Sequence, residues 1–174
     1  MTLRKILIEP DPILRKKCEP VSIVDNKLRT LMNDMVQTMY NAPGIGLAAI
    51  QVGILKRVVV IDLTKEGEEK NPFYFVNPEI ISTSKNKSKY EEGCLSIPGQ
   101  FAEIERPSEC NLKYLDYDGN KKELKATGLL ATCIQHEIDH LNGILFIDYL
   151  SKLKKTMIIK KLSKQKKNLE RVVV

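Results

Sequence analysis

Apolar residues recur along this chain at helical spacing, and this periodicity predicts its main helices. Between residues 25 and 40 the apolar positions stand three and four residues apart, which is typical of an amphipathic helix. A breaker cluster at residues 41–44 ends this helix. A second helix is expected over residues 128–142, with Thr127 as its N-cap and Asn142-Gly143 at its end.

Runs rich in β-branched and aromatic residues predict the strands. The run over residues 57–62 indicates a buried strand because it is largely β-branched. Residues 73–76 and 79–82 indicate two further short strands, bent at Asn77-Pro78.

A hairpin and a short helical segment complete the expected elements. Residues 111–117 and 122–126 predict the hairpin, with a primed turn at Asp118-Gly119. Residues 11–17 predict one or two helical turns, capped by Asp11. Because strands and helices do not alternate regularly, we expect an α+β fold with antiparallel or mixed sheets.

The composition is typical of an ordinary globular domain. The chain has 174 residues, of which 43% are hydrophobic and 29% charged, and this length suits a single domain. No apolar run approaches the ~20 residues of a membrane span, and the first ten residues lack the apolar stretch of a secretory signal. Four widely spaced cysteines without a CxxC pair indicate a reducing compartment, so we expect a cytoplasmic protein.

Positive charge is concentrated at the C-terminal end of the sequence. Residues 151–174 contain nine lysines and arginines against one acid, whereas residues 1–150 carry a net charge of −2. Apolar residues at helical spacing from Leu150 to Val172 predict a long amphipathic helix with a basic outer face. We therefore expect a main domain over residues 1–150 and a basic helix over residues 151–174 that packs on it or extends from it. The helix is the part expected to meet an anionic partner.

The two histidines of the chain, His136 and His140, stand four residues apart, with Glu137 directly after the first. Positions i and i+4 of a helix project from one face, so both imidazoles can reach one metal ion. Glu137 lies about a third of a turn away, where it can contact a water without binding the metal. The pattern predicts a hydrolase that uses an activated water. We expect this metal-binding helix to lie centrally, with the sheets around it. The alternative is that the pattern, which fixes only three positions, arises by chance.

Two further segments carry candidate chemistry. Cys94 is a core residue, a nucleophile or a metal ligand; as a nucleophile it would need a histidine, and both already belong to the HExxH pattern. As a ligand it joins His136 and His140 in a set that leaves a fourth tetrahedral position for water. Residues 44–51 are small and apolar and end in Gln51. Their glycines either let a bound peptide strand approach closely or form a tight turn into a core strand.

Together these segments resemble the peptide deformylase family. Its GxGLAAxQ, EGCLS and QHExDH motifs stand here at residues 44–51, 92–96 and 135–140, in the family's order and with similar spacing. No motif position departs from the family pattern, and the resemblance covers most of the chain. It implies removal of the formyl group from the N-terminal formylmethionine of newly synthesised polypeptides, with release of formate.

The resemblance also implies the catalytic roles. Residues 1–150 would form the catalytic metallohydrolase domain. Glu137 would take a proton from the attacking water and pass it to the leaving amine. The Gln51 side-chain amide and the Leu95 backbone N–H would stabilise the tetrahedral oxyanion. The metal ligands would be Cys94, His136 and His140. The resemblance implies Fe²⁺, whereas affinity order favours Zn²⁺ at a tetrahedral Cys/His₂ site, so we expect Fe²⁺ with Zn²⁺ as an alternative occupant.

Substrate contacts are expected around the same site. An extended peptide would add a strand to the edge of the cleft, and its methionine side chain would enter an apolar pocket beside the ring of His136. The residues expected to contact the substrate are Ile45, Gly46, Gly93, Leu129 and Cys133. For Leu129 and Cys133, an ordinary place in the core is the alternative interpretation.

Three charged residues near the motifs leave two interpretations open. Glu92 and Arg106 either orient a ligand or the substrate, or they form a surface ion pair. Asp139 either hydrogen-bonds an imidazole N–H and fixes its tautomer, or it faces solvent.

Two other classes of protein are weaker candidates. A zincin-type peptidase would need a third ligand after His140, where no histidine remains and the only glutamate, Glu170, lies in the basic tail. A non-enzymatic RNA-binding protein would close a structural metal site with Cys133 as a fourth ligand. Enzymatic activity and RNA binding are compatible, because the helix over residues 151–174 could bind ribosomal RNA near the nascent-chain exit while the rest of the chain acts as an enzyme. The alternative is that this helix presents only a solvated basic face. No membrane or DNA partner is expected.

Overall fold

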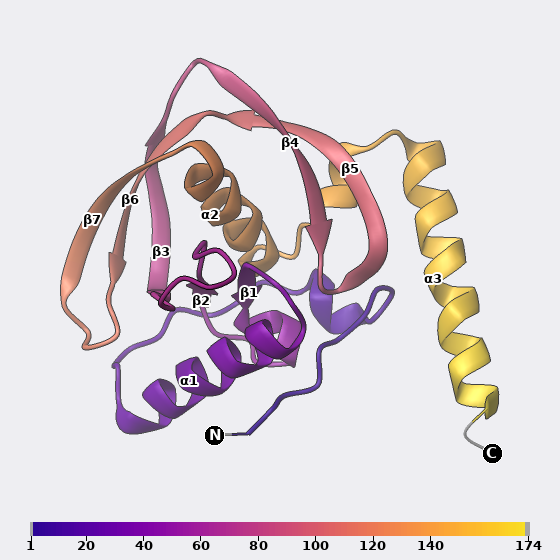
Figure 1. Ribbon diagram of the computed structural model, residues 1–174, viewed down its shortest axis with the longest axis horizontal. Coiled ribbons are helices and arrows are strands. Elements are labelled where there is room, and N and C mark those ends of the chain that lie inside the picture. Colours follow the sequence, from indigo (N-terminus) through magenta and orange to yellow (C-terminus); the bar gives the residue numbers. More distant parts are fainter. Residues whose placement is uncertain (1, 173–174) are drawn as a thin grey trace.

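The computed structural model describes residues 2–172, and side chains up to Gln165. All strand pairs of its two sheets are antiparallel, which confirms the α+β class and the antiparallel alternative (Figure 1). The helices are α1 (Asn26–Asn41), α2 (Gly128–Leu141) and α3 (Lys152–Val172), with short 3-10 helices η1 (Pro12–Arg15), η2 (Ala49–Val52) and η3 (Phe146–Tyr149). The strands are β1 (Gly46–Ala48), β2 (Val58–Ile61), β3 (Phe73–Thr83), β4 (Lys87–Cys94), β5 (Ile97–Pro107), β6 (Glu109–Leu115) and β7 (Lys121–Thr127).

The strands form one sheet of five and one of two. The larger sheet has the order β1-β2-β3-β6-β7, and β4 and β5 pair as a separate long hairpin. The chain leaves the large sheet at the end of β3, forms the hairpin, and returns directly into β6. The hairpin therefore projects from the large sheet while remaining tied to it at both ends (Figure 1).

Strand β2 is buried on both faces because helices α1 and α2 pack against opposite sides of the large sheet. Val58 and Val60 belong to the apolar cluster formed with α1. Val59 and Ile61, on the other face, belong to the cluster formed with α2. This two-sided burial explains the β-branched sequence of the strand.

Both predicted main helices begin and end within one residue of the expected positions. In α1 the Asp25 side chain accepts a hydrogen bond from the Leu28 N–H at 2.8 Å, which caps the first turn. Thr127 stands at the N-cap of α2, but its side chain makes no capping hydrogen bond. Helix α2 ends at Leu141, two residues before Gly143, which has φ +76°.

Helix α3 packs through its middle against β5 and η3. Leu162 is buried with Ile97 and Phe146 in a third apolar cluster, and Lys155 forms an ion pair with Asp148 at 2.5 Å. Leu153 lies on the exposed side of the helix. No helix of the described chain combines the length and apolar character needed to cross a membrane.

Three expectations about the strands need correction. Residues 73–83 form one continuous strand, with a register irregularity between Val76 and Glu79 where two strands were predicted. The prediction of a primed turn at Asp118-Gly119 is wrong, because Asp118 does not have the positive φ that such a turn requires. The loop is also longer than two residues and spans residues 116–120. The β4–β5 hairpin was not predicted at all.

Gly143 offers a test of how tightly the end of α2 packs against the N-terminal segment. A Cβ at this position would lie 2.5 Å from the Arg15 carbonyl oxygen, a backbone atom that cannot move aside easily. We expect Gly143→Ala to lower the free energy of unfolding by about 3 kcal/mol or more, from strained backbone and steric overlap together. Denaturant unfolding measures the loss.

Gly67→Ala is the matched control, since Gly67 also has positive φ (+88°) but no atom within 4 Å of the added Cβ. This variant isolates the backbone cost, about 1–2 kcal/mol. Equal losses for the two variants would contradict the close packing at Gly143.

Candidate metal centre and active-site cleft

Helix α2 carries both histidines on one buried face. His136 and His140 are 8% and 1% exposed, and their Nε2 atoms lie 3.2 Å apart. Neither imidazole projects toward open solvent, so their nitrogens face each other inside the protein.

Cys94 brings a thiol to the same point from the end of β4. A register irregularity between Gly93 and Cys94 interrupts the hairpin there. The Cys94 Sγ atom lies 3.2 Å from His140 Nε2, and the three potential ligand atoms all lie within 4.8 Å of one another. Bond lengths of about 2.0–2.3 Å around one tetrahedral ion imply ligand separations of roughly 3.3–3.6 Å. The spacing and the donor set therefore fit a divalent transition metal.

Cys133 does not complete this set. Among the described residues the candidate cluster contains Cys94, His136 and His140 alone. Burial raises the pKa of the Cys133 thiol to about 12, so this side chain stays protonated at neutral pH. The three-ligand arrangement is that of a catalytic rather than a closed structural site.

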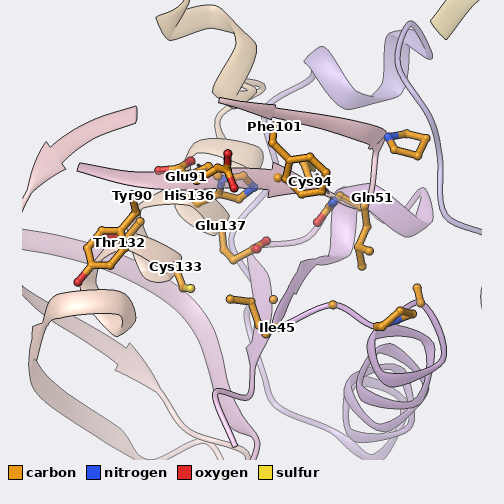
Figure 2. Close-up of a pocket in the computed structure, with 18 of the residues that line it drawn as sticks. Ile45, Gln51, Tyr90, Glu91, Cys94, Phe101, Thr132, Cys133, His136 and Glu137 are labelled. Atoms are coloured by element: carbon orange, nitrogen blue, oxygen red, sulfur yellow. Dashed lines mark hydrogen bonds and ion pairs between the residues drawn. The ribbon is translucent and has the colours of Figure 1, made fainter. Parts of the chain in front are cut away.

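Glu137 points from α2 toward β1 and the cleft (Figure 2). Its carboxylate occupies the space where a side chain on Gly46 would otherwise lie. Burial raises the pKa of Glu137 to about 7, and its Oε2 atom has no hydrogen-bond partner among the described residues. Such an oxygen is suited to a partner that arrives with the reaction, such as a water.

A buried charge network fixes the orientation of His136. Glu92 accepts hydrogen bonds from His136 Nδ1 at 2.8 Å and from Arg106 Nε at 2.6 Å. Although burial alone would raise the pKa of Glu92, these hydrogen bonds hold it below its ordinary value. With Nδ1 bound to the carboxylate, Nε2 is the nitrogen left to face Cys94.

This network excludes one of the two interpretations left open for Glu92 and Arg106, and one of the two left open for Asp139. Glu92 and Arg106 are 6% and 4% exposed, so they do not form a surface ion pair. Asp139 does not contact an imidazole; it accepts hydrogen bonds from Arg106 and from the Tyr149 hydroxyl, both at 2.8 Å. The Tyr149 ring covers the Arg106 guanidinium at 4.9 Å. The sequence offered no sign of this role for Tyr149.

Gln51 lies beside the candidate ligands, on η2. Its side chain is 1% exposed, and Oε1 accepts a hydrogen bond from the Ala48 N–H at 2.9 Å. That bond directs Nε2 toward Ser96 Oγ at 3.1 Å and Cys94 Sγ at 3.5 Å. Ser96 belongs to the EGCLS motif, yet sequence reasoning gave it no role. Leu95 also lines the site, directly after Cys94.

The centre opens into a cleft of about 480 Å³ between the hairpin, β1 and α2 (Figure 2). All five residues predicted to contact the substrate line the cleft: Ile45, Gly46, Gly93, Leu129 and Cys133. Of the two residues predicted to orient a ligand or the substrate, Glu92 lines the cleft and Arg106 does not. Leu129 is 43% exposed, so its interpretation as a core residue is wrong. Tyr90, Phe101 and Thr132 also line the cleft. Two of them come from the hairpin that the sequence pattern did not reveal.

The Glu137 carboxylate lies beside three potential ligand atoms at the floor of an open cleft. This arrangement is that of a metal-dependent hydrolase. The profile of the polypeptide deformylase family matches residues 3–156. The peptide deformylase of Pelagibacter ubique (strain HTCC1062) is 62% identical over 174 residues, covering 100% of both chains. The chain belongs to the peptide deformylase family.

Solved structures agree with this assignment. The crystal structure of peptide deformylase from Ehrlichia chaffeensis matches with a TM-score of 0.91 at 43% identity, covering 96% of this chain and 98% of that one. A structure of peptide deformylase from the same organism, in complex with actinonin, matches with a TM-score of 0.90 at 46% identity, covering 95% and 98%. The likeness therefore extends to the whole fold.

Arg106 provides a test of the buried network. Arg106→Met removes the only cation that contacts both Glu92 and Asp139 among the described residues. We expect the free energy of unfolding of the metal-free protein to fall by about 3–5 kcal/mol, because a buried carboxylate loses its partner. Denaturant unfolding measures this change.

Lys87→Met serves as the control, because Lys87 and its partner Glu105 are both largely exposed. Its loss should stay below about 1 kcal/mol. A similarly small loss for Arg106→Met would show that the network contributes little to folding.

Proposed function

We propose that this chain is a peptide deformylase that hydrolyses the formyl amide of N-terminal formylmethionine on newly synthesised polypeptides and releases formate. Family membership supports the reaction. The observation that carries the assignment to this site is the convergence of Cys94, His136 and His140 within 4.8 Å at the floor of the cleft. The buried carboxylate of Glu137 faces the same space.

Cys94, His136 and His140 would hold the metal. We propose Fe²⁺ as the active ion, with Zn²⁺ as an alternative occupant, since the donor set suits both. When bound, the metal acts as a Lewis acid that lowers the pKa of water from 15.7 toward ~7. Glu92 holds the His136 ring through Nδ1, and Arg106 holds Glu92 in turn. These two residues therefore act on the ligand rather than on the peptide.

Glu137 would serve as the proton carrier. It accepts a proton from the water as the new C–O bond forms at the formyl carbon. When the tetrahedral species collapses, the C–N bond breaks and Glu137 gives the proton to the departing amine. The products are formate and a free methionine N-terminus. The unpaired Glu137 Oε2 atom supports this role.

Gln51 and Leu95 would stabilise the oxyanion of the tetrahedral species. The Gln51 amide nitrogen is held near Cys94 by the bond that its own Oε1 atom makes to β1. This anchoring reduces the reorganisation needed when negative charge develops. The Leu95 backbone N–H is the second proposed donor.

The cleft would bind the substrate mainly through its backbone. A peptide strand alongside Ile45, Gly46 and Gly93 gains main-chain hydrogen bonds that ignore side-chain identity. The methionine side chain would lie against Leu129, Cys133 and the ring of His136. Such recognition suits an enzyme that acts on many different chains.

Residues 1–150 would form the catalytic domain, and residues 151–174 a basic helix attached to it. Because its substrates are made on ribosomes, the enzyme is proposed to act in the cytoplasm. The helix would contact ribosomal RNA near the nascent-chain exit, and its concentration of lysines supports this.

Formate release from a formyl-Met-Ala-Ser peptide, by protein purified anaerobically and with its metal content determined, tests the function. We expect formate from the unchanged protein and none from Glu137→Ala with the metal retained. Metal-loaded protein that releases no formate would contradict the proposal.

Gln51→Ala tests the oxyanion role. Turnover should fall by about 10²–10³-fold while the metal stays bound, because one preorganised donor is lost and no ligand is removed. Gln37→Ala, at an exposed position of α1, is the control and should keep full turnover. A loss of less than about threefold in Gln51→Ala would argue against the role.

Substituting three exposed lysines of α3 tests the ribosome contact. Glutamine at Lys160, Lys161 and Lys164 should weaken ribosome co-sedimentation by about tenfold or more, with a shallower salt dependence. Glutamine at the exposed β7 residues Lys121, Lys122 and Lys125 is the matched control. Equal binding by both triple variants would exclude the contact.

A further inference from the structure

The short helix η3 follows α2 and lies against the metal centre. Its first two residues, Phe146 and Ile147, are buried. The ring of Phe146 stacks on the ring of His136, with 6.3 Å between the centroids and 24° between the planes. One turn of the chain therefore packs directly on a candidate metal ligand.

Asp148 holds η3 in place through three contacts. Its carboxylate accepts a hydrogen bond from the Leu145 N–H at 2.9 Å, which closes the turn. It also forms ion pairs with Arg15 at 2.6 Å and with Lys155 of α3 at 2.5 Å. The position of the next residue, Tyr149, is therefore set by contacts to the N-terminal segment and to α3.

Tyr149 is the outermost member of a path of polar contacts that ends at His136. The Tyr149 hydroxyl and Arg106 Nη1 both donate to Asp139 Oδ2, each at 2.8 Å. Arg106 also donates from Nε and Nη2 to the two carboxylate oxygens of Glu92, at 2.6 and 3.0 Å. Glu92 Oε2 lies 2.8 Å from His136 Nδ1. The path is therefore continuous from the surface to the candidate ligand.

The exposure of these residues falls along the path. Tyr149 is 50% exposed and the Asp139 side chain 16%, whereas Arg106 is 4% exposed. The Tyr149 ring lies over the Arg106 guanidinium, 4.9 Å from it. Tyr149 therefore stands between the solvent and this cation, and it adds a cation–π contact.

Exclusion of water strengthens the ion pair behind the ring. Charge-assisted hydrogen bonds gain strength where the local dielectric constant is low. If water reached Arg106 in place of the ring, Arg106 would hold Glu92 less firmly. The His136 ring would then be freer to rotate, and partners that orient a metal ligand are typically worth about 10–100-fold in metal affinity.

Tyr149 lies too far out to act on the reaction directly. It does not line the cleft, and its hydroxyl donates to Asp139 rather than to a candidate ligand. An effect of Tyr149 on the metal must therefore pass through Asp139 and Arg106.

We propose that Tyr149 is a positioning residue for the metal centre. Its ring shields Arg106, and its hydroxyl fixes Asp139. Through Glu92, these two contacts hold the His136 imidazole in the orientation that binds the ion. This inference rests on the proposed function and deepens it, because it makes retention of the metal depend on a residue outside the cleft.

The rate at which zinc-loaded protein releases its metal to an excess of chelator tests the proposal. Tyr149→Leu removes the ring and the hydroxyl, and it should release zinc about tenfold faster or more. Tyr149→Phe keeps the ring over Arg106, so its release should be only about threefold faster. The KM for formyl-Met-Ala-Ser should stay unchanged in both variants, because neither substitution alters the cleft.

The double variant Tyr149→Leu, Arg106→Met distinguishes positioning from packing. If Tyr149 acts through Arg106, its replacement should change the release rate by less than about twofold once Arg106 is absent. Denaturant unfolding of the metal-free variants is measured alongside. A tyrosine that served only packing would lower the free energy of unfolding without this dependence on Arg106.

Tyr117→Leu is the matched control. The Tyr117 ring also lies under an arginine, Arg29, at 6.0 Å, and its hydroxyl accepts a hydrogen bond from Asn33 at 3.0 Å. Tyr117 does not line the cleft. Its replacement should leave the rate of zinc release unchanged, even where the fold becomes less stable.

Two results would overturn the role of Tyr149 while leaving the proposed function intact. One is an unchanged rate of zinc release in both single Tyr149 variants, whatever their stability. The other is a full tenfold effect of Tyr149→Leu in the Arg106→Met background. Unchanged protein that binds no zinc, or that releases no formate when loaded with metal, would instead overturn the proposed function, so the two failures are distinguishable.

Discussion

The ion pair between Arg106 and Glu92 lies almost wholly out of solvent, and it joins strands β5 and β4 of the hairpin at the place where both residues also contact helix α2. Charges buried in this way are tolerated when every partner is in place. Here Glu92 also holds His136, and Arg106 also reaches Asp139, so a shift of the hairpin against the helix would leave a buried charge unpaired. Because Cys94 follows Glu92 by two residues, the constraint that aligns hairpin and helix also brings the thiol to the two imidazoles.

The cleft combines side chains that are held rigidly with an exposed surface that can accept different peptides. His136, His140 and Glu137 are held by the packing of α2, Cys94 stands at the end of β4 in the hairpin, and Gln51 is held by its bond to β1. In the proposed account, peptide binding depends on exposed backbone and apolar surface, which discriminate weakly between side chains. An enzyme that must accept many polypeptides needs this combination of precise chemistry and permissive binding.

How much the sequence revealed depended on how local each signal was. The two main helices have strong apolar periodicity, and both were predicted to within a residue at each end. The β4–β5 hairpin was missed because charged pairs such as Lys87–Glu105 and Lys89–Glu103 occupy its exposed face in place of apolar alternation. Helical spacing predicted that the two histidines share one face of a helix. The burial of Arg106 could not be inferred, because it depends on the β4–β5 hairpin, which brings Arg106 to Glu92 and was not predicted. Phe101 and Tyr149 gave no local signal, since their roles arise from contacts across the fold.

X-ray absorption at the metal edge of anaerobically purified protein tests most directly the central claim, that Cys94, His136 and His140 together hold one ion. The account predicts a first coordination shell with one sulfur at about 2.3 Å and two imidazole nitrogens at about 2.0–2.1 Å. Replacing Cys94 with serine should remove the sulfur, whereas replacing Cys133 with serine should leave the spectrum unchanged. A second sulfur in the coordination shell, or a sulfur signal that survives the replacement of Cys94, would contradict the claim that these three residues hold the ion.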